Sequence, residues 1–235
     1  MKEFYDEMKK YYEYWWENPR DPRDFIFKKL NELFIKRLPT GENKKALDVG
    51  SGKGTIISYL LSKSYQVTGV ELNENFVREL RNRFPGVEII EGDFNLISLN
   101  NNYDLVTAIE FIQNLDKKSL EKFFNKVSNL TNFLIISVSN RNSLHGFWVN
   151  FRKFKNPFVY LYTPKEIEEI LKSVGFEIHF KKGVGLLTPI TVFRNFKLKL
   201  IPIWVCKIIN FLGDKLFPNF CHLVYIEAKK KEISQ

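Results

Sequence analysis

From residue 45 onward, the chain alternates between short, continuously apolar runs and stretches in which apolar residues recur with helical spacing. The runs predict strands at 45–50, 65–72, 87–94, 103–111, 133–140, 176–182 and 222–230. The stretches between them predict helices at 55–63, 73–84, 115–130 and 163–174. The last of these helices has Thr163 as its N-cap and Pro164 at its first position. Continuously apolar strands that alternate with helices predict one α/β domain with a Rossmann-like, doubly wound and mostly parallel sheet.

The first 43 residues have a different pattern and predict a helical N-terminal extension. Aromatic residues between positions 4 and 16 recur at helical spacing, and a second helix is expected from Asp24 through Leu38. We expect the first helix either to cover the binding crevice as a lid or to pack against the outer helices. As a lid, it would bring Tyr12 and Trp16 to the substrate.

Two stretches do not fit the alternation, namely 140–162 and 183–219. Both combine aromatic residues with lysine and arginine. This composition suits a hydrophobic cap over a substrate pocket, a helix lying on anionic lipid, or a surface that stacks on single-stranded RNA. Insertions beyond the carboxyl ends of strands usually shape the binding crevice of such a sheet, so we expect 183–219 to shape the substrate site.

Composition and charge narrow the class of protein. The 235 residues are 44% hydrophobic and 27% charged, which is typical of a folded globular domain. The net charge of +9 favours anionic partners, although composition alone is explained more readily by a general lysine-rich surface. The charged N-terminus and the two isolated cysteines predict a cytoplasmic protein without a structural metal. The longest apolar stretch, 200–212, contains Pro202 and Lys207 and is too short and interrupted to span a bilayer.

The most informative motif is the glycine loop at 47–54, LDVGSGKG, which follows a predicted strand and opens a helix. A phosphate-binding P-loop requires Ser or Thr after Gly-Lys, but Gly54 follows Lys53 here. A dinucleotide-binding loop requires glycine at position 55, but this chain has Thr55 there. The loop therefore fits neither of the common phosphate-binding patterns.

The loop resembles that of the class I methyltransferases that depend on S-adenosylmethionine (SAM), in which an acidic residue precedes alternating glycines. The resemblance covers about 40–182 and 220–230, and it implies a seven-stranded sheet whose last strand is antiparallel. It also implies that Glu71 accepts hydrogen bonds from the ribose, that Asp93 accepts from the adenine amino group, and that Phe94 lies beside the adenine ring. Many relatives carry His after the acid of the fourth strand, but here Phe111 follows Glu110. The implied cofactor-binding residues are Asp48, Gly50, Ser51, Gly52, Gly54, Glu71, Leu72, Asp93, Phe94 and Glu110.

The segment after the fifth predicted strand gives the best indication of the methyl acceptor. Ser139-Asn140-Arg141 is similar to a segment of the quinone-biosynthesis O-methyltransferases, among the type 11 small-molecule methyltransferases. His145 lies four residues beyond Arg141 and is the candidate general base. The candidate substrate-binding residues are Tyr12, Trp16, Asn140, Arg141 and Trp148.

The sequence thus predicts a single domain: a lid at 1–43, a SAM-binding core at 44–182 and 220–230, and an insertion at 183–219. We expect an enzyme that transfers a methyl group from SAM, leaving S-adenosylhomocysteine (SAH), to an oxygen of a small apolar or lipid-linked acceptor. The alternatives are a tRNA or rRNA methyltransferase and a non-catalytic SAM-binding module. A monomer or homodimer, with peripheral membrane contact, is compatible with these expectations.

Overall fold

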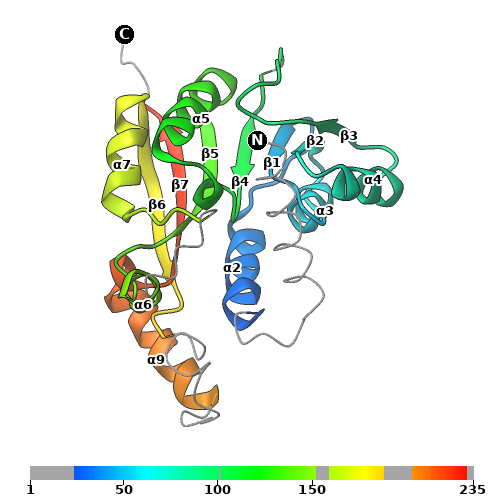
Figure 1. Ribbon diagram of the computed structural model, residues 1–235. Coiled ribbons are helices and arrows are strands. Elements are labelled where there is room, and N and C mark those ends of the chain that lie inside the picture. Colours follow the sequence, from blue (N-terminus) through cyan, green and yellow to red (C-terminus); the bar gives the residue numbers. More distant parts are fainter. Residues whose placement is uncertain (1–23, 101, 152–158, 188–202, 232–235) are drawn as a thin grey trace.

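A computed structural model describes residues 24–100, 102–151, 159–187 and 203–231 (Figure 1). Seven strands form one sheet in the order β3-β2-β1-β4-β5-β7-β6. The strands are β1 (Lys45–Val49), β2 (Gln66–Glu71), β3 (Glu88–Glu91), β4 (Leu105–Ala108), β5 (Phe133–Ser139), β6 (Phe176–Val184) and β7 (Leu223–Lys230). The first five pair in parallel, whereas β7 lies between β5 and β6 and runs antiparallel to both. The predicted fold, including the antiparallel last strand, is confirmed.

The described helices are α2 (Asp24–Arg37), α3 (Thr55–Ser62), α4 (Glu74–Arg83), α5 (Lys117–Leu130), α6 (Leu144–Phe151), α7 (Pro164–Ser173) and α9 (Ile203–Leu216), with 3-10 turns η1 (Ile112–Asn114) and η2 (Pro218–Phe220). Helices α2, α3 and α4 cover one face of the sheet and α5 and α7 cover the other, whereas α6 and α9 lie beyond one end of it (Figure 1). Thr163 caps α7 in a reciprocal capping box with Glu166, as its position before Pro164 predicts. The stretches at 140–162 and 183–219, which broke the alternation, contain α6 and α9.

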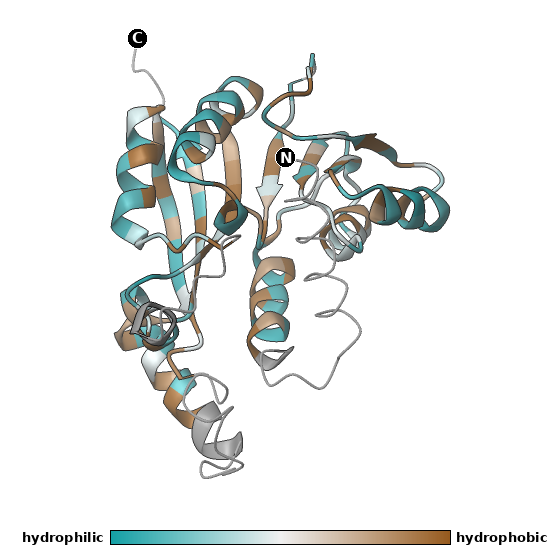
Figure 2. Cartoon of the chain, in the orientation of Figure 1, coloured by the Kyte–Doolittle hydropathy of each residue, from teal (hydrophilic) through white to brown (hydrophobic). Residues whose placement is uncertain are grey.

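The core has two layers because alternate strand residues point to opposite faces of the sheet. Leu47 of β1 belongs to the layer under α5 and α7, whereas the preceding Ala46 belongs to the layer under α2, α3 and α4. Figure 2 shows hydrophobic colours along the central strands, and both faces of these strands are covered. This arrangement explains why the strands read as continuous apolar runs in the sequence.

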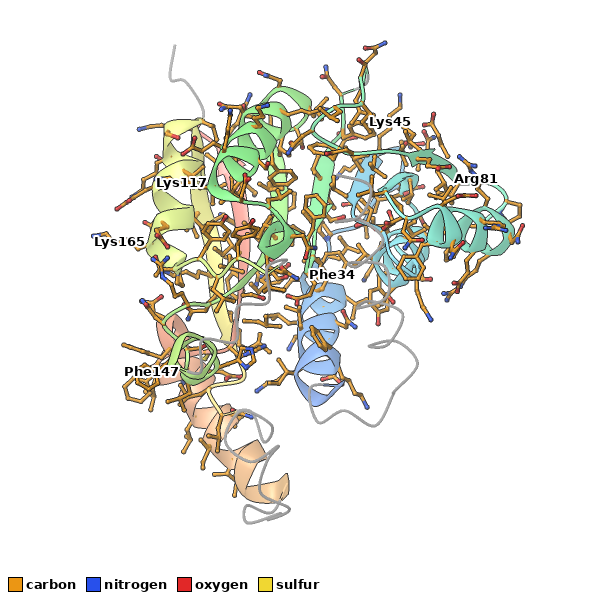
Figure 3. All side chains as sticks on the ribbon, in the orientation of Figure 1. Phe34, Lys45, Arg81, Lys117, Phe147 and Lys165 are labelled. Carbon is orange, nitrogen blue, oxygen red and sulfur yellow. The ribbon has the colours of Figure 1, made fainter. Side chains whose placement is uncertain are left out.

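The described part of the predicted N-terminal lid is α2, and it is a core helix. Ile26, Leu30 and Phe34 are each at most 1% exposed. Figure 3 shows Phe34 at the junction of α2 with the sheet. The first predicted helix, with Tyr12 and Trp16, lies outside the described residues.

A partly buried ion pair anchors the end of α2. Arg37 donates from Nε and Nη2 to the two carboxylate oxygens of Glu227 on β7, at 2.5 and 2.8 Å. The Tyr225 hydroxyl donates to the same carboxylate at 2.9 Å. The Arg37 guanidinium also stacks 3.4 Å above the centre of the Phe180 ring on β6. One side chain therefore ties α2 to both antiparallel strands.

Candidate functional site

The strand order predicts a binding crevice between β1 and β4. From β1 the chain builds one side of the sheet with β2 and β3, and it then returns to build the other side from β4 and β5. In open α/β sheets, ligands bind outside the carboxyl ends of the strands at such a switch point. The glycine loop follows the carboxyl end of β1, and Glu110 and Phe111 follow the end of β4. Both motifs from the sequence analysis therefore meet at this crevice.

The three glycines of the loop have left-handed backbones and different surroundings. Their φ angles are 74° at Gly50, 50° at Gly52 and 78° at Gly54. A Cβ at Gly50 would lie 2.5 Å from the Phe111 ring, and one at Gly54 would lie 2.5 Å from the Phe84 ring. At Gly52, the nearest neighbour would be a backbone oxygen at 4.0 Å. Gly50 and Gly54 thus allow close packing, whereas Gly52 leaves open space for a ligand.

The Glu71 carboxylate fixes the shape of the loop. Its Oε2 accepts a hydrogen bond from Gly52 N at 2.8 Å, and its Oε1 accepts from Leu72 N at 2.9 Å and Asn73 N at 2.8 Å. Burial raises the pKa of Glu71, and the three backbone donors partly offset this. Since a carboxylate offers about four acceptor positions, about one remains for a ligand hydroxyl.

Asp48 brings a buried, incompletely satisfied carboxylate to the same loop. Its side chain is 1% exposed, and its Oδ1 accepts from the Thr107 hydroxyl at 2.8 Å. Its Oδ2 accepts no hydrogen bond from the residues that the structure describes. Burial raises the pKa of Asp48 to about 7. A cation or hydrogen-bond donor at Oδ2 would satisfy this atom and stabilise its ionised form.

Asp93 and Phe94 follow β3, but their side chains have different environments. Asp93 is half-buried, and its Oδ1 accepts from Asn95 N at 2.8 Å. The Phe94 ring is 3% exposed and lies 5.3 Å from the Phe123 ring of α5, within the core. The Phe94 ring thus packs in the core, and its contact with adenine stays a prediction.

Glu110 forms a second polar cluster, which sequence reasoning only partly anticipated. Its φ of 55° is strained for a residue with a side chain. Glu110 N donates to the Ser137 hydroxyl at 2.7 Å, and that hydroxyl donates to Glu110 Oε1 at 2.8 Å. Gln113 Nε2 donates to Glu110 O at 2.6 Å, while Gln113 Oε1 has no hydrogen-bond partner in the described part of the chain. Burial raises the pKa of Glu110 to about 7.

Four of the residues predicted to act on the methyl acceptor lie in α6 or just before it, at 140–148. Asn140 is 1% exposed, and its amide contacts Asn219 O, Cys221 O and Asn142 N at 2.7 to 2.9 Å. These bonds hold the loop in place, and a contact of Asn140 with the substrate stays a prediction. Arg141 pairs with Glu166 at 2.7 Å, and the His145 ring lies 4.3 Å from that of His222. The Trp148 side chain lies outside the described residues.

Comparisons with known proteins agree with this geometry. A family model described as a methyltransferase domain matches residues 46–132. The chain is 30% identical over 125 residues to the ubiquinone biosynthesis O-methyltransferase of Hydrogenovibrio crunogenus, covering 48% of this chain and 52% of that protein. It is 43% identical over 56 residues to ribosomal RNA small subunit methyltransferase A of Geobacter sulfurreducens, covering 23% of this chain and 20% of that protein. The chain therefore spans about half or less of these relatives.

A solved structure is similar over most of the chain. Magnesium protoporphyrin IX methyltransferase from Synechocystis, with bound SAH, superposes with a TM-score of 0.61 at 14% identity and covers 89% of this chain and 83% of that one. At this identity, the likeness establishes the fold. The stretch that the methyltransferase-domain model matches, 46–132, includes the glycine loop after β1 as well as Glu71 and Asp93, and the sheet that carries them has the fold of this solved methyltransferase.

Proposed function

We propose that this protein transfers a methyl group from SAM to an oxygen of a small apolar or lipid-linked acceptor. The observation that carries the proposal is the set of carboxylates at or just after the carboxyl ends of β1, β2 and β3. Asp48 Oδ2 and the remaining position on Glu71 both lie at the loop, and Asp93 lies at the end of β3. The 30% identical quinone-pathway relative supports oxygen as the methylated atom.

The residues present fit SAM better than they fit a phosphorylated nucleotide. SAM carries an ammonium group, two ribose hydroxyls and an adenine amino group, all of which donate hydrogen bonds. Three carboxylates would accept from these donors, with Asp48 suited to the methionine end, Glu71 to the ribose and Asp93 to adenine. The same carboxylates would repel phosphate groups. Ser51 and Leu72 remain proposed cofactor contacts through their positions beside Gly52 and Glu71.

Bound SAM supplies an electrophilic methyl group on a sulfonium centre. The chain must position the acceptor oxygen in line with that methyl group and accept the proton that the oxygen loses. Glu110 suits this second role because its carboxylate follows β4 at the crevice and is held by Ser137. When the oxygen–methyl bond forms and the methyl–sulfur bond breaks, the hydroxyl proton would pass to Glu110, and SAH would remain. His145, the candidate from sequence, stays a second proposal for this role.

Calorimetry and methyl transfer test the proposed function. We expect SAH to bind the protein, and we expect label from methyl-labelled SAM to appear in a hydroquinone or another phenolic acceptor. No binding at millimolar SAH to folded protein would contradict cofactor binding. Label appearing in ribosomal RNA instead would favour the activity of the Geobacter sulfurreducens relative. Binding of SAH without transfer to any acceptor would favour a non-catalytic module.

The Glu110→Gln variant tests the proton acceptor. Because burial raises the pKa of Glu110 to about 7, the carboxyl is protonated below that pH and cannot accept a proton. We therefore expect kcat/KM of the wild type to rise with pH through about 7. Glu110→Gln should lower the upper plateau by about 100-fold, which is within the usual range for general-base catalysis. The pH-dependent rise should also disappear.

Two comparisons make this test specific. Asp48 has a similarly raised pKa, so SAH affinity must be measured across the same pH range to separate cofactor binding from proton transfer. Glu121→Gln, at an exposed site on α5, is the matched control and should keep the wild-type profile. An unchanged profile in Glu110→Gln, together with its loss in His145→Gln, would assign the role to His145.

A further inference from the structure

The amphipathic pattern of α9 is inverted from Ile208 to Leu216, the part whose side chains the structure describes. Its inward side carries Asn210, Gly213 and Asp214, all of which are buried. Its outward side carries Phe211, 75% exposed, with further exposed apolar residues Ile208, Ile209, Leu212 and Leu216. A surface helix normally buries its apolar face and exposes its polar one. The outward face of α9 therefore does not contribute to the core and requires another explanation.

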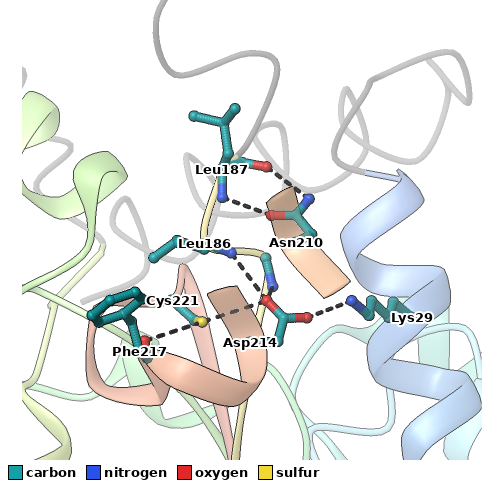
Figure 4. Close-up of polar contacts among 8 residues, drawn as sticks. Lys29, Leu186, Leu187, Asn210, Asp214, Phe217 and Cys221 are labelled. Carbon is teal, nitrogen blue, oxygen red and sulfur yellow. Dashed lines mark hydrogen bonds and ion pairs between the residues drawn. The ribbon is translucent and has the colours of Figure 1, made fainter. Parts of the chain in front are cut away.

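Polar contacts hold α9 in this orientation (Figure 4). Asp214 accepts from Gly185 N at 2.8 Å and Leu186 N at 3.2 Å, and it forms an ion pair with Lys29 of α2. Asn210 accepts from Leu187 N at 2.7 Å and donates to Leu187 O at 2.9 Å. Rolling the helix to bury its apolar face would break these bonds and leave a buried carboxylate without partners.

The exposed apolar face continues beyond α9. Phe217 and Phe220 are 53% and 55% exposed, and on α6 Leu144 and Phe147 are 52% and 67% exposed. The contacts of Asn140 with Asn219 and of His145 with His222 bring α6 beside η2. Figure 3 shows Phe147 at the outer edge of the molecule. We name these residues the apolar end: Leu144, Phe147, Ile208, Ile209, Phe211, Leu212, Leu216, Phe217 and Phe220.

The charges of the surrounding sequence favour an anionic partner. Between positions 185 and 226, Asp214 is the only acidic residue, and it is buried against Lys29. Positions 122–165 contain no acidic residue at all. Basic residues are frequent in both stretches. Lys215 is exposed on α9, Arg141 pairs with Glu166, and the side chains of Arg152, Lys153, Lys155, Arg194, Lys197, Lys199 and Lys207 lie outside the described residues. An apolar surface flanked by basic, acid-free sequence has the composition of a helix that binds anionic lipid.

The side-chain types separate lipid from other anionic partners. Five of the nine residues of the apolar end are Leu or Ile, which cannot stack on bases as aromatic rings do. Protein interfaces are depleted in lysine, whereas membrane-surface helices are enriched in it. Among the residues that the structure describes, no helix is long and apolar enough to cross a membrane. These observations favour insertion into one leaflet.

We propose that the apolar end docks on an anionic membrane surface. α6 follows the carboxyl end of β5, so the docked face lies on the crevice side of the sheet. A lipid-linked acceptor could then enter the crevice directly from the bilayer. This use of the surface rests on the proposed function, whereas docking itself requires neither SAM nor an acceptor.

Vesicle flotation of the full chain tests the docking. We expect the wild type to float with phosphatidylcholine vesicles that contain phosphatidylglycerol, to float less at high salt, and to remain behind with phosphatidylcholine alone. Phe211→Asp should lower the partition coefficient by about tenfold or more, since it removes one large apolar side chain from the bilayer. Leu96→Asp is the matched control, because Leu96 is also 75% exposed but lies in the loop after β3.

Three outcomes would overturn the proposal: no flotation of the wild type at low salt, equal flotation with both vesicle types, or equal losses in the two variants. If the wild type does not float but is a dimer that Phe211→Asp dissociates, the occupant is a second copy of the chain. SAH calorimetry on the same samples separates docking from the proposed function. Flotation without SAH binding would support docking while contradicting the proposed function, and the reverse result would do the opposite.

Discussion

Replacing Glu71 with alanine is expected to weaken SAH binding by on the order of 100-fold. The substitution removes the proposed ribose contact and leaves the N–H groups of Gly52, Leu72 and Asn73 without their acceptor. A hydrogen bond to a charged group contributes about 1.5–3 kcal/mol, so loss of the ribose contact accounts for about 2.7 kcal/mol, which corresponds to 100-fold in affinity. Titration calorimetry with SAH measures this loss directly.

Glu74→Ala is the control for this prediction. Glu74 lies in the first turn of α4, and its exposed carboxylate makes a weak pair with Arg78 at 3.8 Å. Its removal should leave SAH affinity within about threefold of the wild type. Circular dichroism must show that Glu71→Ala still folds. A folded Glu71→Ala protein with wild-type affinity would show that Glu71 only shapes the loop and does not hold the cofactor.

Replacing Arg37 with methionine is expected to lower the free energy of unfolding by about 3 kcal/mol. The substitution keeps the apolar stem but leaves the Glu227 carboxylate, which is 3% exposed, without its cation. It also removes the stacking on Phe180, which ties α2 to β6. For a chain of this length, such a loss lowers the Tm by about 6–12 °C. Thermal unfolding followed by circular dichroism provides the measurement.

Two further variants separate the ion pair from general effects on α2. Lys36→Met, at the exposed neighbouring position, should change the Tm by less than about 2 °C. Arg37→Met combined with Glu227→Leu should recover part of the loss, because no uncompensated charge then remains in the core. The explanation fails if Arg37→Met unfolds at the same temperature as Lys36→Met, or if the double variant is less stable than the single one.

Local patterns in the sequence predicted the sheet and the glycine loop well. The apolar runs of β1, β2, β4, β5 and β7 became strands that are buried on both faces, and Thr163 caps α7 where the pattern places it. Strand ends were harder to predict. The predicted strand at 103–111 ends at Ala108, since Ile109 and Glu110 turn away to form the crevice. The hydrophobic pattern alone does not predict that turn, because apolar residues continue on both sides of it.

Side-chain roles were less predictable because they depend on contacts between distant segments. Asn140 was predicted to contact the substrate, and the sequence did not indicate that its amide donates hydrogen bonds to Asn219 O and Cys221 O, about eighty positions away. Ser137 and Gln113 carried no signal in the sequence, although they hold Glu110 in place. The inverted face of α9 was also not predictable, because polar residues such as Asn210 and Asp214 normally face solvent. Their burial depends on contacts with Lys29 and with 185–187, which are distant in the sequence.

The position of β7 has a consequence for how the chain assembles during synthesis. Although β7 comes after β6 in the sequence, it lies between β5 and β6 in the sheet. The first five strands can therefore associate while the chain is still emerging from the ribosome. β6 can join the sheet only after β7, its neighbour, has been synthesised, and the ion pair that anchors α2 can form only after Glu227 has been synthesised. The residues of the apolar end precede β7 in the sequence, so they leave the ribosome before the strand that supports them. They are therefore exposed in the nascent chain, where a chaperone or a nearby membrane can bind them before the sheet is complete.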